Sequence, residues 1–406
     1  MGNADYPNPV NYSTIVDQLT IAEYLMGTFW DNSRKHSFIM DKLMKAGVMH
    51  DQQGKHIDLK ARVGVHAAAY RSQGGARTFS HPQQYVTYLQ QAAFYEVATA
   101  LYEEEVAFLE TQGAIVKYNR ELATNVGEDL VKGMNYQLLN SNATSNTIAG
   151  VAAAAASPIP FTGILSVFGY GSTALGFTYS SGSGGASTTS AVSAADLEVL
   201  PNVTYCNVST HPTAAIAGVD NKVPGATSPV IVNWSSTGFS AASSTYTSNC
   251  LAVWTRMISR LVAREPSMEG MPDTGVQTLA MHNQMKTALR ASTEQHIVLT
   301  DAPQQPDAGL YARMMIPYEG LSIAMDVDQP TGVAFCLNLK KKNALLPVIR
   351  QNLAGMPDGI FKGNVKPIIK LSQMPDINDG THKLVAKVAA NLILNPARQA
   401  MAYPFA

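Results

Sequence analysis

Charged side chains are scarce in this sequence. They make up 15% of its 406 residues, where about 25% is typical of soluble globular proteins. A soluble monomer of this size normally needs more ionic groups on its surface, so we infer that much of the surface meets other subunits. The 29 basic and 30 acidic residues give a net charge of -1, which excludes the basic excess that specific nucleic-acid binding requires.

Cysteines are also rare, and the sequence shows no pattern of a secretory signal or a membrane span. The three cysteines, Cys206, Cys250 and Cys336, are odd in number and lack metal-type spacing, so neither a disulfide framework nor a zinc site is indicated, and a reducing cytoplasm suits them. The N-terminus has no basic segment followed by an apolar run. The uncharged, Ala-rich stretch 148–169 is broken by two prolines, which argues against a membrane helix.

Familiar catalytic and cofactor motifs are absent as well. The sequence contains neither GxSxG nor HExxH, and its nine histidines are scattered. The glycines at 169–171 lack the strand-helix frame of a dinucleotide site, and Gly54-Lys55 is followed by His56 rather than by the Ser or Thr of a P-loop. We therefore expect no catalytic, cofactor-binding or metal-binding residues, and we expect that the protein is not an enzyme.

Three charged clusters favour a structural interpretation. Consecutive strand residues point to opposite faces, so Glu103–Glu105 indicate a solvated or inter-subunit ion-pairing run rather than a cation site. Asp326 and Asp328 lie two apart with Glu319 nearby, but the pattern of a calcium loop is absent, which favours turn-flanking acids. Lys340–Lys342 are typical of a solvated face, with phosphate contact as the alternative.

The first hundred residues predict a helix and then a ribbon. Behind an N-terminal arm, apolar residues four apart predict a short helix over 37–45 with Ser37 as its cap. Apolar and charged residues alternate strictly over 56–63, which predicts a strand with one buried face. After a polar turn at 64–82, strand character resumes over 83–101. Together these segments predict a two-stranded projection, too thin to bury its own core and stable only against another surface.

A long helix is predicted from 108 to 140. Its apolar residues recur every four positions and drift around the helix by about 40° per step, so its two halves should pack against different partners. These residues are Tyr118, Leu122, Val126, Leu130, Met134 and Leu138. Gly127 and Gly133 each cost about 1 kcal/mol relative to alanine, which indicates a bend or the close approach of another backbone.

The middle of the chain has a different composition. Between 143 and 248, 61 of 106 residues are Ala, Ser, Thr or Gly, and only Asp196, Glu198, Asp220 and Lys222 are charged. The composition indicates an insertion. Strand-like segments at 199–208 and 230–234 favour a β-rich appendage over a disordered linker.

Helical patterning returns after the insertion. Apolar spacing predicts a helix around 251–262 with Ser248 as its cap, a second from Thr274 to Arg290, and a third over 343–353. Strand signals are mixed with these helices, so the fold class is α+β.

The strand signals lie in two places. Alternating apolar residues at 321–327 and 333–339 flank a Pro-Gly turn at 328–332 and predict a hairpin. The apolar run 384–394 is typical of a central strand.

The order of these pieces resembles the major capsid proteins of tailed bacteriophages, which share the Hong Kong 97 fold. The resemblance covers 15–142 and 249–406 and leaves the insertion unmatched. The similar motifs are FWDNSRKHSFIMDKLMKAG (29–47), GKHIDLKARV (54–63), NRELATNVGEDLVKGMNYQLLN (119–140), MPDTGVQTLAMHNQMKTAL (271–289), MIPYEGLSIAMDVDQP (315–330) and VAANLILNPARQAMAY (388–403).

The resemblance implies a division of the chain into six parts. They are an N-terminal arm and short helix (1–53), an extended loop or E-loop (54–101), a peripheral domain with the spine helix (102–142), the Ser/Thr/Ala/Gly-rich β insertion (143–248), an axial domain (249–383) and a terminal strand that returns to the peripheral domain (384–406).

The function implied is structural. Such proteins assemble as hexamers and pentamers into an icosahedral shell that encloses double-stranded DNA without sequence-specific binding, which agrees with the neutral charge. The resemblance also implies a virion location, assembly in the host cytoplasm, a portal, and possible decoration proteins. Because the chain begins just before the arm, we expect a separate scaffolding protein. Because 64–84 contains no lysine, we expect no covalent cross-link between subunits.

Two alternatives remain open at this stage. An encapsulin-type compartment shares the fold and packages enzymes, although the large insertion argues against it. A β-rich tail or receptor-binding protein suits the Ser/Thr-rich insertion but leaves the long helix and the ribbon unexplained.

Overall fold

The computed structural model describes fifteen segments of the chain, and every structural statement below refers to them. They are residues 37–46, 48–52, 56–62, 85–102, 112–141, 161–168, 197–199, 203–206, 208–210, 228–239, 244–264, 270–292, 315–349, 368–371 and 381–404.

A mixed seven-stranded sheet forms one half of the molecule. Its strand order is β10-β11-β9-β12-β17-β8-β5. In that order the strands are Ile316–Tyr318, Leu321–Met325, Thr274–Gln277, Ala334–Leu337, Ala400–Tyr403, Val230–Asn233 and Glu198–Val199. All residues of β9, β12, β17 and β8 are buried, so both faces of the sheet are covered.

Successive side chains of these strands point alternately into the cores on the two faces of the sheet. Val230 and Val232 of β8 pack with α7 (Tyr246–Arg264) and α8 (Leu279–Ala291), whose buried stripes include Trp254 and Met285. Ile231 between them belongs to the core on the opposite face. That second core contains α6 (Ile164–Val167), and the ring of Phe168 after α6 stacks on Phe335 of β12 with centroids 6.0 Å apart.

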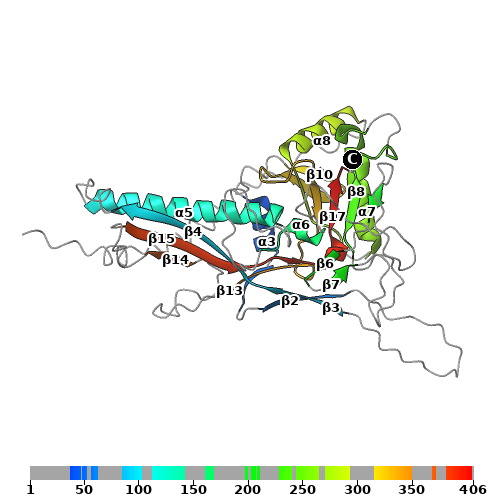
Figure 1. Cartoon of the computed structure of the whole chain (residues 1–406). Coiled ribbons are helices and arrows are strands. Elements are labelled where there is room, and N and C mark those ends of the chain that lie inside the picture. Colours follow the sequence, from blue (N-terminus) through cyan, green and yellow to red (C-terminus); the bar gives the residue numbers. More distant parts are fainter. Residues whose placement is uncertain are drawn as a thin grey trace, which may run out of the picture.

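A six-stranded sheet forms the other half. Its longest pair is β4 (Ala93–Tyr102) and β15 (Thr381–Ala390), which are antiparallel over ten residues. The remaining strands are β1 (Met49–Gln52), β13 (Ala344–Ile349), β14 (Ile368–Leu371) and β16 (Ile393–Leu394). Helix α5 (Gln112–Asn140) runs beside β4 and β15, and together they extend to the left in Figure 1.

Three smaller elements complete the fold. Helix α3 (Phe38–Lys45) leads into β1. Strands β2 (His56–Arg62) and β3 (Tyr85–Gln91) form a separate antiparallel ribbon, and β6 (Val203–Tyr205) pairs with β7 (Val208–Thr210). The ribbon lies along the lower edge of the molecule, apart from α7 and α8 (Figure 1).

The C-terminal segment joins the two sheets. The sequence predicts one terminal strand at 384–406 that returns to the long sheet, but only its first part does so, in β15 and β16. The chain then passes through a 3₁₀ turn at Pro396–Arg398 and enters the seven-stranded sheet as β17, between β12 and β8. The apolar run of 384–394 is thus a central strand up to Ala390.

Several sequence predictions are confirmed. Helix α3 begins where Ser37 caps it, since the Met40 amide donates to Ser37 Oγ at 3.2 Å. Strand β2 buries Ile57 and Leu59 and exposes the charged residues between them. Helix α5 spans 29 residues with a buried second half, and α7 covers the predicted 251–262 but begins earlier, at Tyr246.

The predicted hairpin of 321–327 and 333–339 is wrong. Both segments form strands, β11 and β12, but β9 lies between them and pairs with each. The real hairpin is β10–β11, whose turn at Glu319 and Gly320 has φ of 48° and 79°. The eight residues 326–333 therefore connect two strands, β11 and β12, that are separated by a third strand, β9, from earlier in the chain.

Two helix predictions also need correction. The stretch from Thr274 to Arg290 begins as strand β9, and α8 starts only after Thr278, whose side chain caps it by accepting from the Met281 amide at 3.3 Å. The predicted helix 343–353 is strand β13 as far as Ile349. Pro347 within it would be costly inside a helix.

The middle of the chain is not simply an appendage. Its segments 161–168 and 230–233 are fully buried, and β8 is an inner strand of the seven-stranded sheet, parallel to β17. Its strand character is confirmed for β6, β7 and β8. Within the described part of the chain, no helix combines the length and apolar composition needed to cross a bilayer.

Candidate assembly surface and its anchors

The ribbon β2–β3 has two different faces. In its register Leu59 lies opposite Tyr88 and Asp58 opposite Leu89. Directly opposed residues share a face, because side chains alternate along each strand. The inner face is fully buried and consists of Ile57, Leu59, Ala61, Val86 and Tyr88.

The inner face packs on the protein's own core, chiefly through Tyr205 of β6. The rings of Tyr88 and Tyr205 lie 6.0 Å apart, and the Leu89 amide donates to the Cys206 carbonyl at 3.4 Å. The Tyr205 hydroxyl in turn accepts from the Leu394 amide at 3.0 Å. The base of the ribbon is therefore held within the subunit, which corrects the expectation that the whole ribbon needs a foreign surface. Residues 64–84 lie outside the described residues.

Strand β4 gives a second correction to the ribbon. The sequence places 83–101 entirely in the projection, but residues from Ala93 onward pair with β15 in the six-stranded sheet. Only Tyr85–Gln91 pairs with β2. The projection is thus shorter at its base than predicted.

The anchor of the ribbon is chemically inert. Burial raises the pKa of Tyr88 and of Tyr205 above the usual value for a phenol. Burial also raises the pKa of the Cys206 thiol to about 12, so it stays a thiol at neutral pH and a poor nucleophile. Cys250 and Cys336 are also free and buried. These side chains contribute to packing.

The outer face of the ribbon is exposed. Tyr85 and Leu89 of β3 have exposed fractions of 55% and 42%, and they are two of four large apolar side chains that the described residues expose. Asp58 and Lys60 of β2 are exposed beside them. An aromatic and an aliphatic residue among charges of both signs is a composition suited to a protein contact.

A polar junction joins the two halves of the molecule. The side chain of Asn135 on α5 donates to Asp328 Oδ2 at 2.8 Å and to Asp326 Oδ1 at 3.2 Å, while its oxygen accepts from Ser37 Oγ at 2.5 Å. The carbonyl of Asp328 accepts from the Asn140 side chain at 2.7 Å. One amide thus connects α3 and α5 with the turn that follows β11.

The two acids predicted to flank a turn do so, and they also meet. Asp326 is 2% exposed, and its carboxylate accepts from the Asp328 amide at 3.0 Å. Burial raises the pKa of Asp326 to about 6, and the nearby charge of Asp328 contributes to the increase. Glu319 lies elsewhere, at the β10–β11 turn, where it accepts from Thr255 at 2.6 Å.

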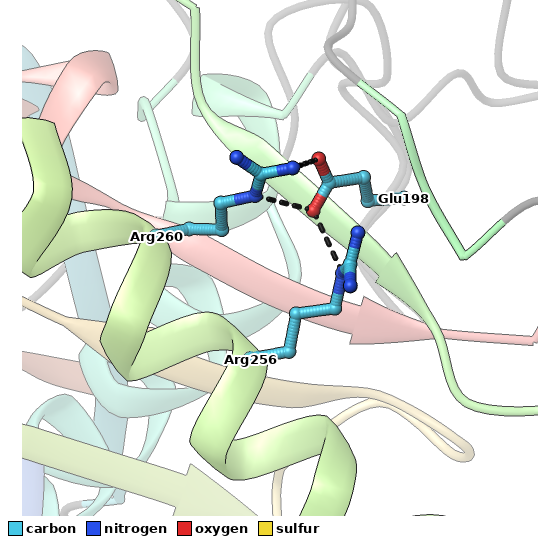
Figure 2. A network of polar contacts seen from close by, with 3 residues as sticks. All are labelled: Glu198, Arg256 and Arg260. Carbon is cyan, nitrogen blue, oxygen red and sulfur yellow. Dashed lines mark hydrogen bonds and ion pairs between the residues drawn. The ribbon is translucent and has the colours of Figure 1, made fainter.

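An ion-pair network fixes the edge of the seven-stranded sheet. Glu198 of β5 accepts from Arg256 Nε at 2.9 Å and from Arg260 Nε at 2.8 Å, and Figure 2 shows both guanidinium groups meeting its carboxylate. The two arginines lie one turn apart on α7. One turn further, the half-buried Arg264 donates from its guanidinium to the Ala397 carbonyl at 3.0 Å. The network ties the edge strand to the helix that covers it.

Of the other candidate clusters, Lys340–Lys342 lies within the described residues. Lys341 and Lys342 are exposed, as expected for a solvated face, and Lys340 donates to the Met271 carbonyl at 3.0 Å. Glu103–Glu105, the glycines at 169–171 and Gly54-Lys55 lie outside the described residues. Among the residues described, no three His, Cys, Asp or Glu side chains are grouped so as to hold a metal ion.

Sequence reasoning missed the most important anchors. Asn135, Tyr205 and Arg264 carry no motif, and their partners lie far away in the chain, such as Asp326 for Asn135. A polar residue within an otherwise apolar helix stripe is the only pattern that marks Asn135.

Comparison with solved structures finds proteins of similar architecture. The chain is similar to the capsid asymmetric unit of cyanophage A-1(L), with a TM-score of 0.51 and 15% identity over 89% of this chain and 92% of the other. It is also similar to a structure of Mycobacterium phage Bobi (TM-score 0.45, 12% identity, 89% of each chain). A third is the holo-SrpI encapsulin complex from Synechococcus elongatus PCC 7942 (TM-score 0.44, 7% identity, 89% of this chain and 86% of the other).

The first of these similarities defines the fold. The chain has the α+β fold of a phage capsid protein, which confirms at the level of fold the resemblance found in the sequence. No protein-family model matches the sequence, and no curated protein matches it.

Proposed function

We propose that this chain is the major capsid protein of a tailed bacteriophage, with the Hong Kong 97-like division into arm, extended loop, spine helix, peripheral domain and axial domain. It assembles as hexamers and pentamers into an icosahedral shell that encloses double-stranded DNA. The observation that carries the proposal is the capsid-protein fold, shared over 89% of the chain. Helix α5 is the spine helix, and the β2–β3 ribbon is the base of the extended loop.

The exposed face of the ribbon supplies the contact in this proposal. Tyr85 and Leu89 provide apolar area, while the alternating charges of β2 favour one register on a neighbouring subunit. Interfaces of about 800 Å² per partner are normal, and apolar area contributes about 25 cal/mol per Å² before the costs of association. Many such modest contacts, closed into a shell, make it durable.

The partners follow from the same proposal. A separate scaffolding protein directs assembly in the host cytoplasm, a portal occupies one vertex, and a decoration protein can bind the finished shell. The balanced charge of 29 basic and 30 acidic residues supports enclosure of DNA without sequence-specific binding. The role is structural and involves no catalysis.

Purified particles test the proposal. We expect the full chain, produced with the other head proteins of its phage, to form closed icosahedral shells that contain double-stranded DNA, as seen by cryo-electron microscopy and by nuclease-protected DNA content. Shells that contain a packaged enzyme and no DNA would instead establish the encapsulin alternative. A stable monomer or trimer at high concentration would refute both and favour a tail protein.

The scaffold has its own test. We expect the chain expressed alone to give aggregates or irregular shells, and uniform closed shells without a second protein would refute the need for a scaffold.

Boiled denaturing gels of mature particles should show a single monomer band, whereas a ladder of multimers would contradict the absence of cross-links.

A further inference from the structure

The two halves of the molecule meet at the junction formed by Ser37, Asn135, Asp326 and Asp328. Asn135 belongs to α5, which packs on the six-stranded sheet, whereas Asp326 and Asp328 follow β11 of the seven-stranded sheet. Ser37 caps α3 and is bonded to the same amide. A change in the angle between the two sheets would therefore alter the hydrogen bonds of this junction.

Asn135 has no hydrogen-bonding capacity to spare on its amide nitrogen. Its two N–H groups serve two carboxylates, Asp326 at 3.2 and 3.4 Å and Asp328 at 2.8 Å. An asparagine side chain offers only these two donors. One neutral amide thus holds two acidic groups that are close enough for the Asp328 amide to bond to Asp326.

Among the described residues, the groups that contact Asp326 supply no positive charge. Helix α5 presents the Asn135 amide, β9 presents the Gln277 carbonyl to the Asp326 amide at 3.1 Å, and α3 reaches the site through Ser37. Desolvation by burial is the main cause that raises the pKa of Asp326, and the charge of Asp328 adds to it, while hydrogen bonds from the Asp328 amide and from Asn135 act in the opposite direction. Two carboxylates in such a setting favour retention of a proton, and Asp326 has a pKa raised to about 6, above its ordinary value near 4.

We propose that this junction is a proton-linked latch between the two sheets. With Asp326 protonated, the repulsion from Asp328 is gone and Asn135 holds α3, α5 and the β11 turn together. With Asp326 ionised, the two carboxylates repel each other within a buried site, and the turn separates from Asn135 more often. Use of the latch in adjusting subunit shape during shell assembly rests on the proposed function, but the latch itself does not.

Hydrogen exchange at the junction tests the proposal on the full-length chain. The reporters are the backbone amides of Met40, Asp326 and Asp328, followed between pH 5 and pH 7 and corrected for the intrinsic pH dependence of exchange. A group whose pKa is about 6 in the closed junction and near 4 in the open one changes the opening equilibrium about tenfold over this range. We therefore expect protection to be about tenfold lower at pH 7 than at pH 5.

Asp326→Asn removes the titrating group but keeps the shape and the acceptor for Asn135. We expect its protection to be independent of pH, while the matched control Asp58→Asn, on the exposed face of the ribbon, behaves like the wild type. If Asp326→Asn does not fold, Asp328→Asn serves instead, and the pH midpoint should shift downward because the repelling charge is gone. Protection in the wild type that does not change with pH would overturn the proposal, as would an unchanged pH dependence in Asp326→Asn. Failure to form shells would leave these results intact and count only against the proposed function.

Discussion

At the scale of single residues, Gly163 marks a close approach between the backbones of two elements. A Cβ placed on it would lie 2.6 Å from the carbonyl oxygen of Gln137 and 3.0 Å from that of Leu138, both at the C-terminal end of α5. Backbone atoms of a packed helix cannot move away cheaply. We expect Gly163→Ala to lower the free energy of unfolding by about 1–3 kcal/mol, measured by urea denaturation.

Gly133 provides the matched control for that measurement. It lies in the middle of α5, and an added Cβ would meet the end of the Tyr95 side chain, with Tyr95 Cζ at 2.7 Å. Tyr95 is only partly buried, so its ring can turn aside. Gly133→Ala should cost less than Gly163→Ala, and equal losses would contradict the distinction between backbone and side-chain neighbours. The sequence predicts a bend or the close approach of another backbone at Gly133, but the neighbour there is the Tyr95 side chain.

Tyr205 carries a second prediction at this scale. Its hydroxyl accepts from the Leu394 amide at 3.0 Å, and both groups are buried. Tyr205→Phe leaves that amide without its acceptor, which costs about 1–3 kcal/mol of unfolding free energy. Tyr88→Phe is the control, because among the described residues the buried Tyr88 hydroxyl has no hydrogen-bond partner. That variant should be as stable as the wild type or more so, and equal losses in the two variants would refute the role of Tyr205.

Individual residues also show what a sequence can and cannot reveal. The alternation over 56–63 identifies Ile57 and Leu59 as buried, because a strand fixes the direction of each side chain locally. The same logic says nothing of Asn135, whose acidic partners are about 190 positions away. Contacts of that kind depend on how the sheets meet, and no local period encodes them.

At the scale of elements, the edge strand β5 depends on charge as well as on backbone pairing. Only two of its residues pair with β8, so the contacts from Glu198 to Arg256 and Arg260 help to hold it in place. The ion pairs are partly exposed, with side-chain exposures of 30% and 49% for the two arginines, and such pairs contribute at most about 1 kcal/mol.

We expect Glu198→Gln to lower the free energy of unfolding by less than about 1 kcal/mol at low salt, with the difference shrinking as salt screens the pair. Urea denaturation at two ionic strengths measures this change. Glu121→Gln, at an exposed position of α5, is the control and should show no such difference. A loss that persists in concentrated salt would mean that Glu198 acts through packing and not through charge.

The errors in predicting elements have a common physical cause. The stretch 344–349 reads as helix by its apolar spacing, but β1 on one side and β15 and β16 on the other capture it as a strand. In the same way, β9 enters between β11 and β12 and replaces the hairpin that their turn suggests. Tertiary pairing overrides local propensity in both cases, whereas the long helix α5 and the strand β2 are set by strong local patterns.

At the scale of the whole molecule, the ribbon separates folding from assembly. Its base is held by Tyr205 and the core, so removal of the residues beyond the base should leave the subunit folded. We expect deletion of 67–79 to leave the urea unfolding transition close to that of the wild type and to abolish closed shells in electron micrographs. Normal particles from this variant would refute the assignment of the extended loop. A lost unfolding transition would show instead that the deleted residues are needed for folding.

The path of the last twenty residues has a mechanical consequence. The segment leaves the six-stranded sheet at β16 and enters the centre of the seven-stranded sheet as β17, with a hydrogen-bonded strand on either side. A force on one half of the subunit is therefore transmitted along the polypeptide backbone into the interior of the other half. In the proposed shell, pressure from the enclosed DNA would act on both halves together, and neither half could open while the other stayed closed.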